Sequence, residues 1–244
     1  MVLRQLFVGV MIIAFDTYYY EGYSYTVGGV FESWLSSDVS YYVTSKRECI
    51  DAEYKSGELY KRELPCIMQC LSMVNLDSID TIIVDGFVWL SEDGKELTKG
   101  LGARLDDAIQ QLYCSIKSII GIAKNPYHVK IPNCIEVKHG LESEKPLYVT
   151  CNDVDYVNHY ATLVSRMHGD YRIPTILKLV DTKTREFKNK IEKEETEISE
   201  PSAPIGLDMS DLDKWAEEAF SMPNVERALE AWTSESEKNG FRYR

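Results

Sequence analysis

The residues of this chain best suited to chemistry are three acids, Asp16, Glu63 and Asp85. Asp16 and Asp85 each come at the end of an apolar run that predicts a β-strand. Both are therefore expected at the C-terminal edge of a sheet, where open α/β sheets bind their ligands. An isolated aspartate after a strand is more often a turn residue bonded to its own backbone. Two such acids, with a third on a neighbouring helix, favour a shared site.

Glu63 is the most informative of the three because it lies among apolar residues of a predicted helix. Leu59 precedes it by one turn and Ile67 follows it by one turn, so these residues share a helix face. An ionised glutamate that faces a core is unfavourable unless it is paired or binds a metal. Arg62 and Lys61 are near in sequence but point to other faces. A buried ion pair and a metal site both remain open.

Carboxylates gathered at one sheet edge repel one another and need cations between them. Their hard oxygen atoms suit Mg²⁺ or Mn²⁺. Two such ions, roughly 4 Å apart, can activate a water and stabilise the leaving oxygen in phosphodiester hydrolysis. Lys124 follows another predicted strand and could reach the same edge, where a point cation would orient a phosphate. The alternative is an ordinary exposed lysine after a strand.

The elements that would position these residues follow one another in an order typical of a mixed sheet. The first three strands are rich in β-branched and aromatic residues and are joined by brief turns, which predicts an antiparallel meander. Amphipathic helices and short buried strands follow them. The predicted elements are strands over residues 5–16, 22–34 and 39–44, a helix from about 57 to 74, a strand ending at 85, a loop over 87–99, a helix over 101–113, strands over 118–123 and 145–150, and helices over 154–168 and 174–190.

This order fits an α/β fold with a ribonuclease H-like sheet, in which the fourth strand lies parallel to the first and beside it. Asp16 and Asp85 would then end neighbouring strands at the point where the connections reverse direction. We expect one domain over residues 1–190 and an acidic linker with a helical extension over 191–244. In the extension, the helical periodicity of residues 205–232 predicts helices that pack on the main domain, on a protein partner or on a second copy of the chain.

The composition favours a cytoplasmic protein with a reduced interior. The longest apolar stretch, residues 6–15, is about half of the roughly 20 residues that a membrane span needs. The six cysteines form no CxxC pair and have no histidines at zinc spacing. The net charge is −12, but residues 191–244 hold 14 acids and 6 bases, which leaves 25 acids and 21 bases before them. The overall charge is therefore weak evidence against a nucleic-acid partner.

The spacing of these elements resembles the endonuclease V family, whose members nick nucleic acid near deaminated adenine (inosine). Six short blocks occur in the family's order, and together they extend over nearly all of residues 8–187. The blocks are Phe15 and Asp16, residues 54–65 (YKSGELYKRELP), residues 84–86 (VDG), residues 119–124 (IIGIAK), residues 145–150 (KPLYVT), and residues 171–174 (YRIP) with 179–181 (LVD).

The resemblance implies a role for each matching residue in a magnesium- or manganese-dependent endonuclease. It implies metal ligation by Asp16, Glu63 and Asp85, with Asp181 as a further acid close to the metals, and it makes Lys124 the catalytic lysine on the phosphate side. In the family, the flipped hypoxanthine base sits in a pocket built largely from backbone. By block position that pocket would be lined by Gly57, Leu59, Gly86 and Gly121, and Tyr54 would fill the gap left by the base.

The chain departs from the family pattern where the family reads the base and separates the strands. Residues 53–56 (EYKS) lack the prolines of the family's Pro-Tyr-Ile-Pro, and Phe87 and Val88 replace its His-Gly. Residues 102–106 (GARLD) replace its Ala-Ser-His-Leu-Gly block. The sequence thus leaves three hypotheses. They are an inosine-directed endonuclease on DNA or RNA, a divergent structure-directed nuclease without inosine preference, and a catalytically weak nucleic-acid-binding or interaction protein.

Overall fold

The computed structural model describes residues 11–48, 60–110, 116–141 and 143–199, with only the helical backbone for 194–199. The strands are β1 (Met11–Tyr20), β2 (Tyr23–Phe31), β3 (Tyr41–Glu48), β4 (Ile79–Asp85), β5 (Trp89–Leu90), β6 (Thr98–Lys99), β7 (Ser118–Ala123), β8 (Ile135–Val137) and β9 (Leu147–Cys151). The helices are α1 (Tyr60–Leu71), α2 (Leu101–Gln110), α3 (Val157–Ser165) and α4 (Thr175–Ser199), with 3₁₀ turns η1 (Leu76–Ser78) and η2 (Val154–Tyr156).

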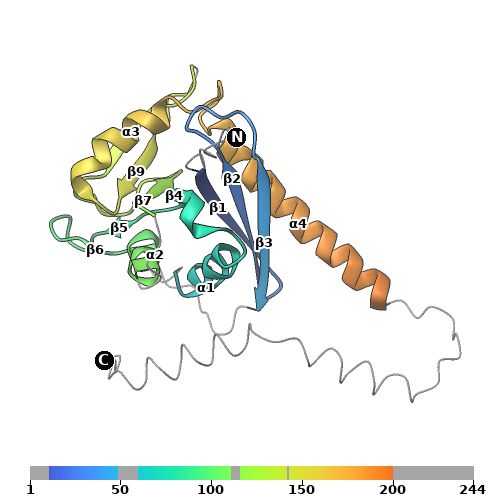
Figure 1. Cartoon of the computed structure of the whole chain (residues 1–244). Coiled ribbons are helices and arrows are strands. Elements are labelled where there is room, and N and C mark those ends of the chain that lie inside the picture. The colour runs from blue at the N-terminus through green and yellow to red at the C-terminus, as the bar shows by residue number, and fades with distance from the viewer. Residues whose placement is uncertain (1–10, 49–59, 111–115, 142, 200–244) are drawn as a thin grey trace, which may run out of the picture. The chain divides into compact units, whose positions relative to one another are not determined.

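Seven of the strands form one mixed sheet in the order β3-β2-β1-β4-β7-β9-β8 (Figure 1). The strands β1, β2 and β3 are antiparallel neighbours, and Glu21 and Gly22 make the first turn with positive φ angles of 47° and 80°. The strands β4 and β7 then run parallel to β1, one beside the other. The predicted ribonuclease H-like arrangement, with the fourth strand beside the first, is confirmed.

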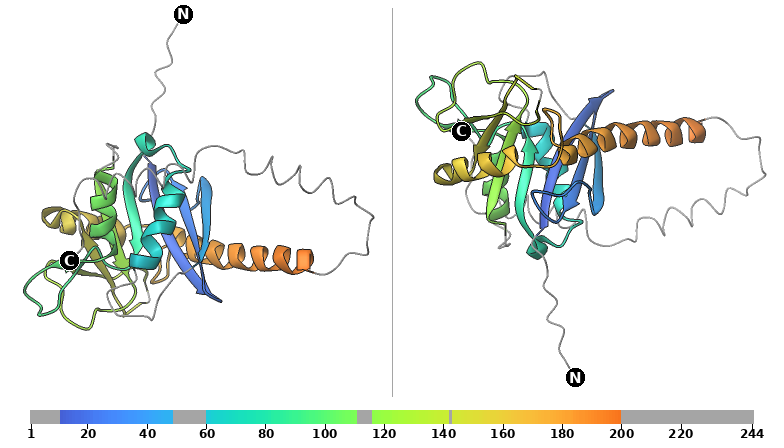
Figure 2. Two further views of the ribbon diagram at one scale, coloured as in Figure 1. Left: turned by 90° about the horizontal axis from the view of Figure 1, so that it is seen from below. Right: turned by 90° about the horizontal axis from the view of Figure 1, so that it is seen from above.

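Helices cover both faces of the sheet (Figures 1 and 2). Each face has its own apolar core. Side chains alternate along each strand, so neighbours such as Ile12 and Ile13 enter different cores. The core beneath α1 and α2 includes Ile67 and Leu105, and the core beneath α3 and α4 includes Val180. Within the described part of the chain, no helix is both long enough and apolar enough to span a membrane.

The largest differences from the sequence prediction lie at the edges of the sheet and in α4. The segment predicted as a loop over residues 87–99 contains the small β5–β6 hairpin, and β8 and β9 add an antiparallel edge beside β7. The predicted linker at the start of residues 191–244 is wrong in its first part, because α4 continues to Ser199. Glutamate and lysine are good helix formers, and the Lys188–Glu192 pair, at 2.5 Å, supports the helix one turn apart. The compact unit that holds the sheet extends to Glu194.

Candidate active site

The alternation of side chains along the three parallel strands brings two of the predicted acids and the lysine to one face. Each strand contributes one residue to the core beneath α3 and α4, and a polar residue follows it two positions later. Side chains two positions apart in a strand point to the same face of the sheet, so the polar residue lies on the α4 face. These side chains all line a small cavity of about 30 Å³ beneath α4. The pairs are Ala14 and Asp16 in β1, Ile83 and Asp85 in β4, and Ile122 with Lys124 directly after β7.

Asp16 and Asp85 lie on neighbouring strands and influence each other's charge. Asp85 ends β4, but the predicted end of the first strand at Asp16 is wrong, because β1 continues to Tyr20 in its pairing with β2. The parallel register pairs Phe15 with Val84, so the two aspartates follow at equivalent positions. Burial raises the pKa of Asp16 from 3.8 to about 6, and the charge of Asp85 acts in the same direction. Lys124 opposes both effects. Asp16 thus carries its charge at neutral pH in a place that favours the neutral acid.

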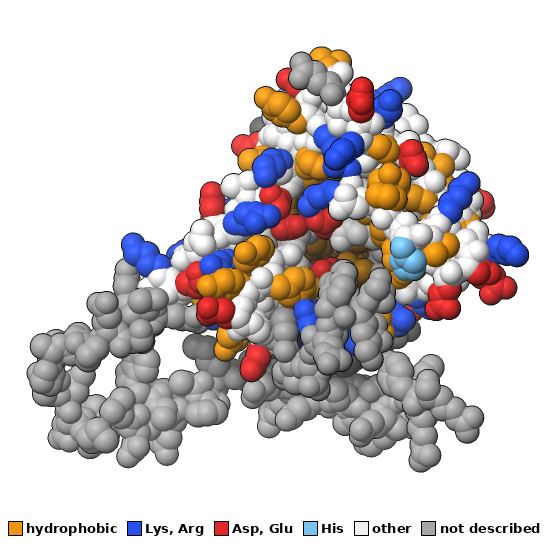
Figure 3. Space-filling model, turned by 180° about the vertical axis from the view of Figure 1, so that it is seen from behind, with side chains coloured by type: hydrophobic (Ala, Val, Ile, Leu, Met, Phe, Trp, Pro, Cys, Tyr) orange, Lys and Arg blue, Asp and Glu red, His pale blue; other side chains and the backbone are white. Residues whose placement is uncertain are grey.

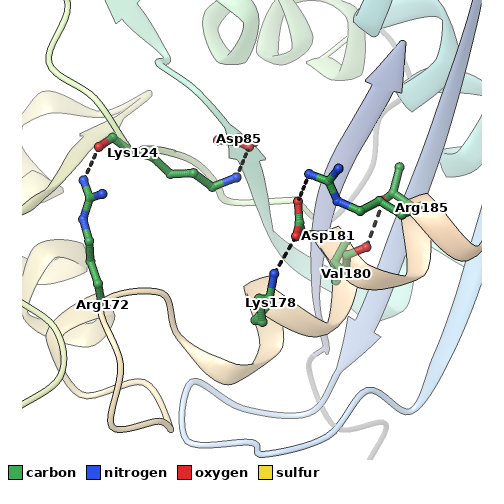
Figure 4. Close-up of polar contacts among 8 residues, drawn as sticks. Asp85, Lys124, Arg172, Lys178, Val180, Asp181 and Arg185 are labelled. Atoms are coloured by element: carbon green, nitrogen blue, oxygen red, sulfur yellow. Dashed lines mark hydrogen bonds and ion pairs between the residues drawn. The ribbon is translucent and has the colours of Figure 1, made fainter. Parts of the chain in front are cut away.

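Lys124 is held against Asp85 by an ion pair at the mouth of this site (Figure 4). Its Nζ donates to Asp85 Oδ2 at 2.7 Å. Burial lowers the pKa of Lys124, but the carboxylates of Asp85, Asp16 and Asp181 outweigh that effect and hold the pKa above its ordinary value. Lys124 is therefore a fixed positive charge at neutral pH and not a general base.

Glu63 approaches from α1, on the opposite side of the sheet edge. Its Oε1 accepts a hydrogen bond from the Tyr19 hydroxyl at 2.9 Å. The side chain is partly exposed, but protein surrounds the carboxyl group, and this burial raises its pKa from 4.5 to about 8. The Tyr19 hydroxyl lowers the pKa, whereas Asp85 and Asp16 raise it further. The partner of Glu63 thus comes from β1 and was not foreseen from its helix neighbours.

The three acids and Lys124 line one larger cavity, of about 550 Å³, at the C-terminal ends of β4 and β7 and beside the point of β1 where its pairing with β4 ends. This cavity contains residues from both sides of the sheet edge, which is how Glu63 joins Asp16 and Asp85. Figure 3 shows the hollow, with Lys and Arg side chains beside acids on one side of it and a histidine with hydrophobic side chains on the other. Of the predicted set, Asp16, Glu63, Asp85 and Lys124 are therefore brought together.

The donor set fits a divalent cation by its chemistry. Three carboxylates face one cavity. The pKa values of Asp16 and Glu63 are raised there, and the charge of Asp85 contributes to both shifts. Such shifts are expected of oxygen ligands that lack a neutralising charge. As the side chains stand, no three acidic, histidine or cysteine residues of the described segments are close enough to hold one ion. Glu63 is held by Tyr19 and Asp85 by Lys124.

Asp181, the fourth predicted acid, lies on α4 and binds two cations of its own helix (Figure 4). It accepts from Lys178 Nζ at 3.0 Å and from Arg185 Nη2 at 3.2 Å. Burial acts to raise its pKa, but these two partners outweigh it and hold the pKa below its ordinary value. Asp181 raises the pKa values of Asp16 and Lys124, so its charge acts on the site, although it does not line the larger cavity.

The residues predicted to bind a base have different placements. Gly86 lines the larger cavity with a φ of 129°, which suits a glycine. Gly121 is buried behind it and is not among the residues that line the cavity. Tyr54, Gly57 and Leu59 lie outside the described residues, as does the segment 205–232 with its predicted partner contacts.

Arg172 is a site residue that the sequence reasoning missed. Its guanidinium donates to the carbonyl oxygen of Lys124 (Figure 4). It also donates to the carbonyl oxygens of Pro146 and Lys145, at 2.8 and 3.1 Å. It therefore ties the segment after β7, where Lys124 lies, to the segment before β9. An arginine in the YRIP block was a visible signal, because a planar guanidinium can bind several carbonyls at once. The fold was needed to show which carbonyls these are.

The first prediction concerns the stability of the cation-free protein. We expect Glu63→Gln to be more stable than the wild type at pH 8 in EDTA and equally stable at pH 4. The folded pKa of Glu63 is raised, so its ionisation withdraws stability as the pH rises from 4.5 to about 8, by up to roughly 1.4 kcal/mol per pH unit. Glutamine can still accept from Tyr19. Urea unfolding between pH 4 and 8.5 measures this difference.

The control for this measurement is Glu136→Gln, at an exposed glutamate of β8. Its stability should follow the wild-type pH dependence throughout the range. A Glu63→Gln protein that was less stable than the wild type at pH 8 would show that ionised Glu63 is a stabilising, structural acid.

Comparison with known proteins gives matches among solved structures. No family model matches the sequence, and no curated protein matches it. The endonuclease V of Streptomyces avermitilis aligns with a TM-score of 0.54 at 19% identity, over 75% of this chain and 82% of that one. Human ENDOV aligns with a TM-score of 0.53 at 18% identity, over 74% and 85% of the two chains. The Bacillus subtilis Endonuclease_V gives a TM-score of 0.50 at 20% identity, over 75% and 82%.

These three likenesses cover most of the described domain and show its fold. The predicted resemblance to endonuclease V is thus confirmed for the arrangement of the chain, because structures at 18–20% identity share topology rather than residues. What the site of this chain does must be argued from its own side chains.

Proposed function

We propose that this chain is a divalent-cation-dependent endonuclease that hydrolyses a phosphodiester bond of DNA or RNA. The observation that carries the proposal is the meeting of Asp16, Glu63, Asp85 and Lys124 at one cavity of about 550 Å³, at the C-terminal edge of parallel strands. That combination of hard oxygen ligands and one fixed cation suits phosphate chemistry. The likeness to the three endonuclease V structures supports it.

Asp16, Glu63 and Asp85 would hold Mg²⁺ or Mn²⁺. The bound cation would lower the pKa of a water and neutralise charge on the leaving oxygen of the phosphodiester. Asp16 and Glu63, whose pKa values are about 6 and 8, would release protons when the cation binds. Cation affinity should therefore increase with pH over this range.

Lys124 supplies the positive charge on the substrate side. Its ammonium already lies beside a carboxylate at the cavity, and it keeps its proton at neutral pH. It can therefore donate hydrogen bonds to a non-bridging phosphate oxygen and offset the charge that develops there during hydrolysis. In that step a water oxygen bonds to phosphorus, one bridging P–O bond breaks, and the leaving oxygen takes up a proton.

The test is a cleavage assay on labelled oligonucleotides with Mg²⁺, Mn²⁺ or EDTA. The substrates are DNA and RNA strands, single or paired, with inosine, an abasic site, a mismatch or a flap. Cleavage that needs the cation supports the proposal. Retained binding without cleavage of any substrate would contradict it and favour the catalytically weak nucleic-acid-binding protein. Cleavage of the inosine strands alone would identify the inosine-directed enzyme of the family resemblance.

A second prediction concerns Arg172 as a positioning residue. We expect Arg172→Ala to lower kcat about 10-fold with little change in KM, because the segment that carries Lys124 loses its hydrogen bonds to the guanidinium and shifts relative to the phosphate. Arg172→Lys should recover little, since an ammonium cannot reproduce the fork that binds several carbonyls. Steady-state kinetics on the cleaved oligonucleotide measure the split between kcat and KM.

The matched control for Arg172 is Arg166→Ala, at an exposed arginine just after α3. It removes the same charge without touching the site, so kcat and KM should stay within 2-fold of the wild type. Full kcat in Arg172→Lys would contradict this prediction, because it would show that a positive charge at residue 172 is sufficient and that the planar guanidinium is not required.

A further inference from the structure

Several backbone polar groups of the loop that follows Asp85 make hydrogen bonds within the fold. The N–H of Gly86 donates to the Ile122 carbonyl at 3.2 Å, and the N–H of Val88 donates to Thr150 Oγ1 at 2.9 Å. The carbonyl of Val88 accepts from Gly100 at 2.9 Å. Each of these three groups is bonded to a residue outside the loop, so the Gly86 and Val88 N–H groups are not available to read the edge of a base.

The space between this loop and Gly121 is closed. A Cβ on Gly121 would come within 2.6 Å of the Gly86 carbonyl oxygen and 2.7 Å of the Val88 nitrogen, so the two segments are already in contact. The Val88 side chain is fully buried and fills the space against Gly102. A flat ring therefore has no slot between Gly86 and Gly121.

An aromatic wall, formed by Phe87, Tyr127 and His128, faces the larger cavity instead. The Phe87 and Tyr127 rings meet edge to face at 5.9 Å, and the Tyr127 and His128 rings lie 4.0 Å apart. Phe87 and Tyr127 are half-buried, so each keeps ring surface open to the cavity. Neither the Tyr127 hydroxyl nor the His128 ring is fixed by a hydrogen bond to another described residue. The wall thus offers ring faces and no donor held in a set direction.

The wall adjoins the residues that would act on the phosphate. Phe87 comes two residues after Asp85, and Tyr127 comes three residues after Lys124. A base stacked on the wall would therefore belong to a nucleotide next to the phosphate held by Lys124. Stacking on an aromatic ring tolerates every base, because each base has a π face, and it requires that the base be unpaired.

We propose that the aromatic wall of Phe87, Tyr127 and His128 stacks one unpaired base of the substrate without reading its identity. The substrate class is single-stranded nucleic acid, or a duplex with an unpaired nucleotide beside the cleaved bond, and inosine is bound no better than other bases. This inference rests on the proposed nuclease function and specifies its substrate.

The experiment measures binding and cleavage separately, with full-length protein. Single strands that differ at one central position, carrying A, C, G, T, inosine or an abasic site, are titrated in EDTA by fluorescence anisotropy and then cleaved in Mg²⁺. The five bases should give Kd values and cleavage rates within about 3-fold, and the abasic strand should bind about 10-fold more weakly. The same comparison in RNA tests whether the sugar matters.

Variants of the wall complete the test. Phe87→Leu keeps the apolar bulk without the ring, and Tyr127→Ala removes the second ring of the wall. Each should weaken binding of all five bases about 10-fold and remove the penalty of the abasic site. Tyr156→Ala, at an exposed tyrosine that does not line the cavity, is the control and should bind as the wild type does.

The outcomes separate this inference from the function on which it rests. A preference of 10-fold or more for inosine would overturn base-tolerant stacking and leave the nuclease in place. Unchanged affinity for the abasic strand, or for Phe87→Leu with wild-type Tm, would overturn the stacking role of the wall. Loss of the proposed nuclease function would appear as an absence of cleavage on every strand, whatever the Kd values show.

Discussion

Replacing Asp16 with asparagine is expected to abolish cation-dependent cleavage and, at the same time, to stabilise the cation-free protein. The rate should fall at least about 100-fold, because a cation ligand at the reacting phosphate is lost. The stability gain follows from the pKa of Asp16, which is raised to about 6, chiefly by burial and then by Asp85. A raised folded pKa means that ionisation withdraws stability as the pH rises from 3.8 to about 6. Above that window the gain should be roughly 2–3 kcal/mol.

The measurements are oligonucleotide cleavage in Mg²⁺ and urea unfolding in EDTA at pH 3.5 and pH 8. Asp85→Asn should lose cleavage to the same extent but change stability by less than about 1 kcal/mol, because its pair with Lys124 is well exposed. The matched control is Asp107→Asn, whose aspartate makes a similar exposed pair with Lys99 at 2.6 Å away from the cavity. It should leave cleavage unchanged. Marked destabilisation of Asp16→Asn at pH 8 would instead identify Asp16 as a structural acid.

A loss of cleavage together with a gain in stability is characteristic of a residue in a functional site and not of a core residue. A core residue stabilises the fold in every condition, whereas crowded carboxylates withdraw stability until a ligand neutralises them. Both Asp16 and Glu63 have raised pKa values, and both face the same cavity. Cation binding should therefore stabilise the wild type more than either single variant.

The strand acids could be placed from the sequence because period-2 alternation and topology determine where they lie. The apolar run ending in Asp85 predicts the end of β4 correctly, whereas β1 continues past Asp16 to Tyr20. The order of elements predicts that the two strands are adjacent. The register, with Phe15 beside Val84, confirms this adjacency. The edge hairpin and β8 were missed because strands of two or three residues leave too short a pattern to recognise.

Contacts between distant segments could not be predicted from periodicity. Glu63 is held by Tyr19, and Lys124 is held in place by Arg172, through pairs that are 44 and 48 residues apart. The closure of the space beside Gly121 also depends on other segments, because the Gly86 carbonyl oxygen, Thr150 Oγ1 and the Val88 nitrogen lie next to it. The sequence identified Val88 as a departure from the family pattern, and packing shows that its buried side chain lies against Gly102.

Lys124→Ala is expected to lower the cleavage rate about 100-fold, because it removes the fixed positive charge beside the phosphate. Lys124→Arg should retain part of the rate, since arginine keeps the charge but presents it in a different geometry. The wild-type rate should show no loss from deprotonation of Lys124 between pH 7 and 10, because the carboxylates of Asp85 and Asp16 hold its pKa above the ordinary 10.5. A pH–rate profile of all three proteins measures these effects.

The matched control for Lys124 is Lys99→Ala, which breaks the similarly exposed pair with Asp107 away from the cavity. Its cleavage rate should stay within 2-fold of the wild type. Removing Lys124 also leaves Asp16 and Asp85 unshielded, so the pKa of Asp16 should rise further and the cation-free variant should lose stability at pH 8 but not at pH 3.5. Wild-type cleavage by Lys124→Ala would place the phosphate elsewhere in the cavity, and an equal loss of stability at both pH values would make Lys124 a packing residue.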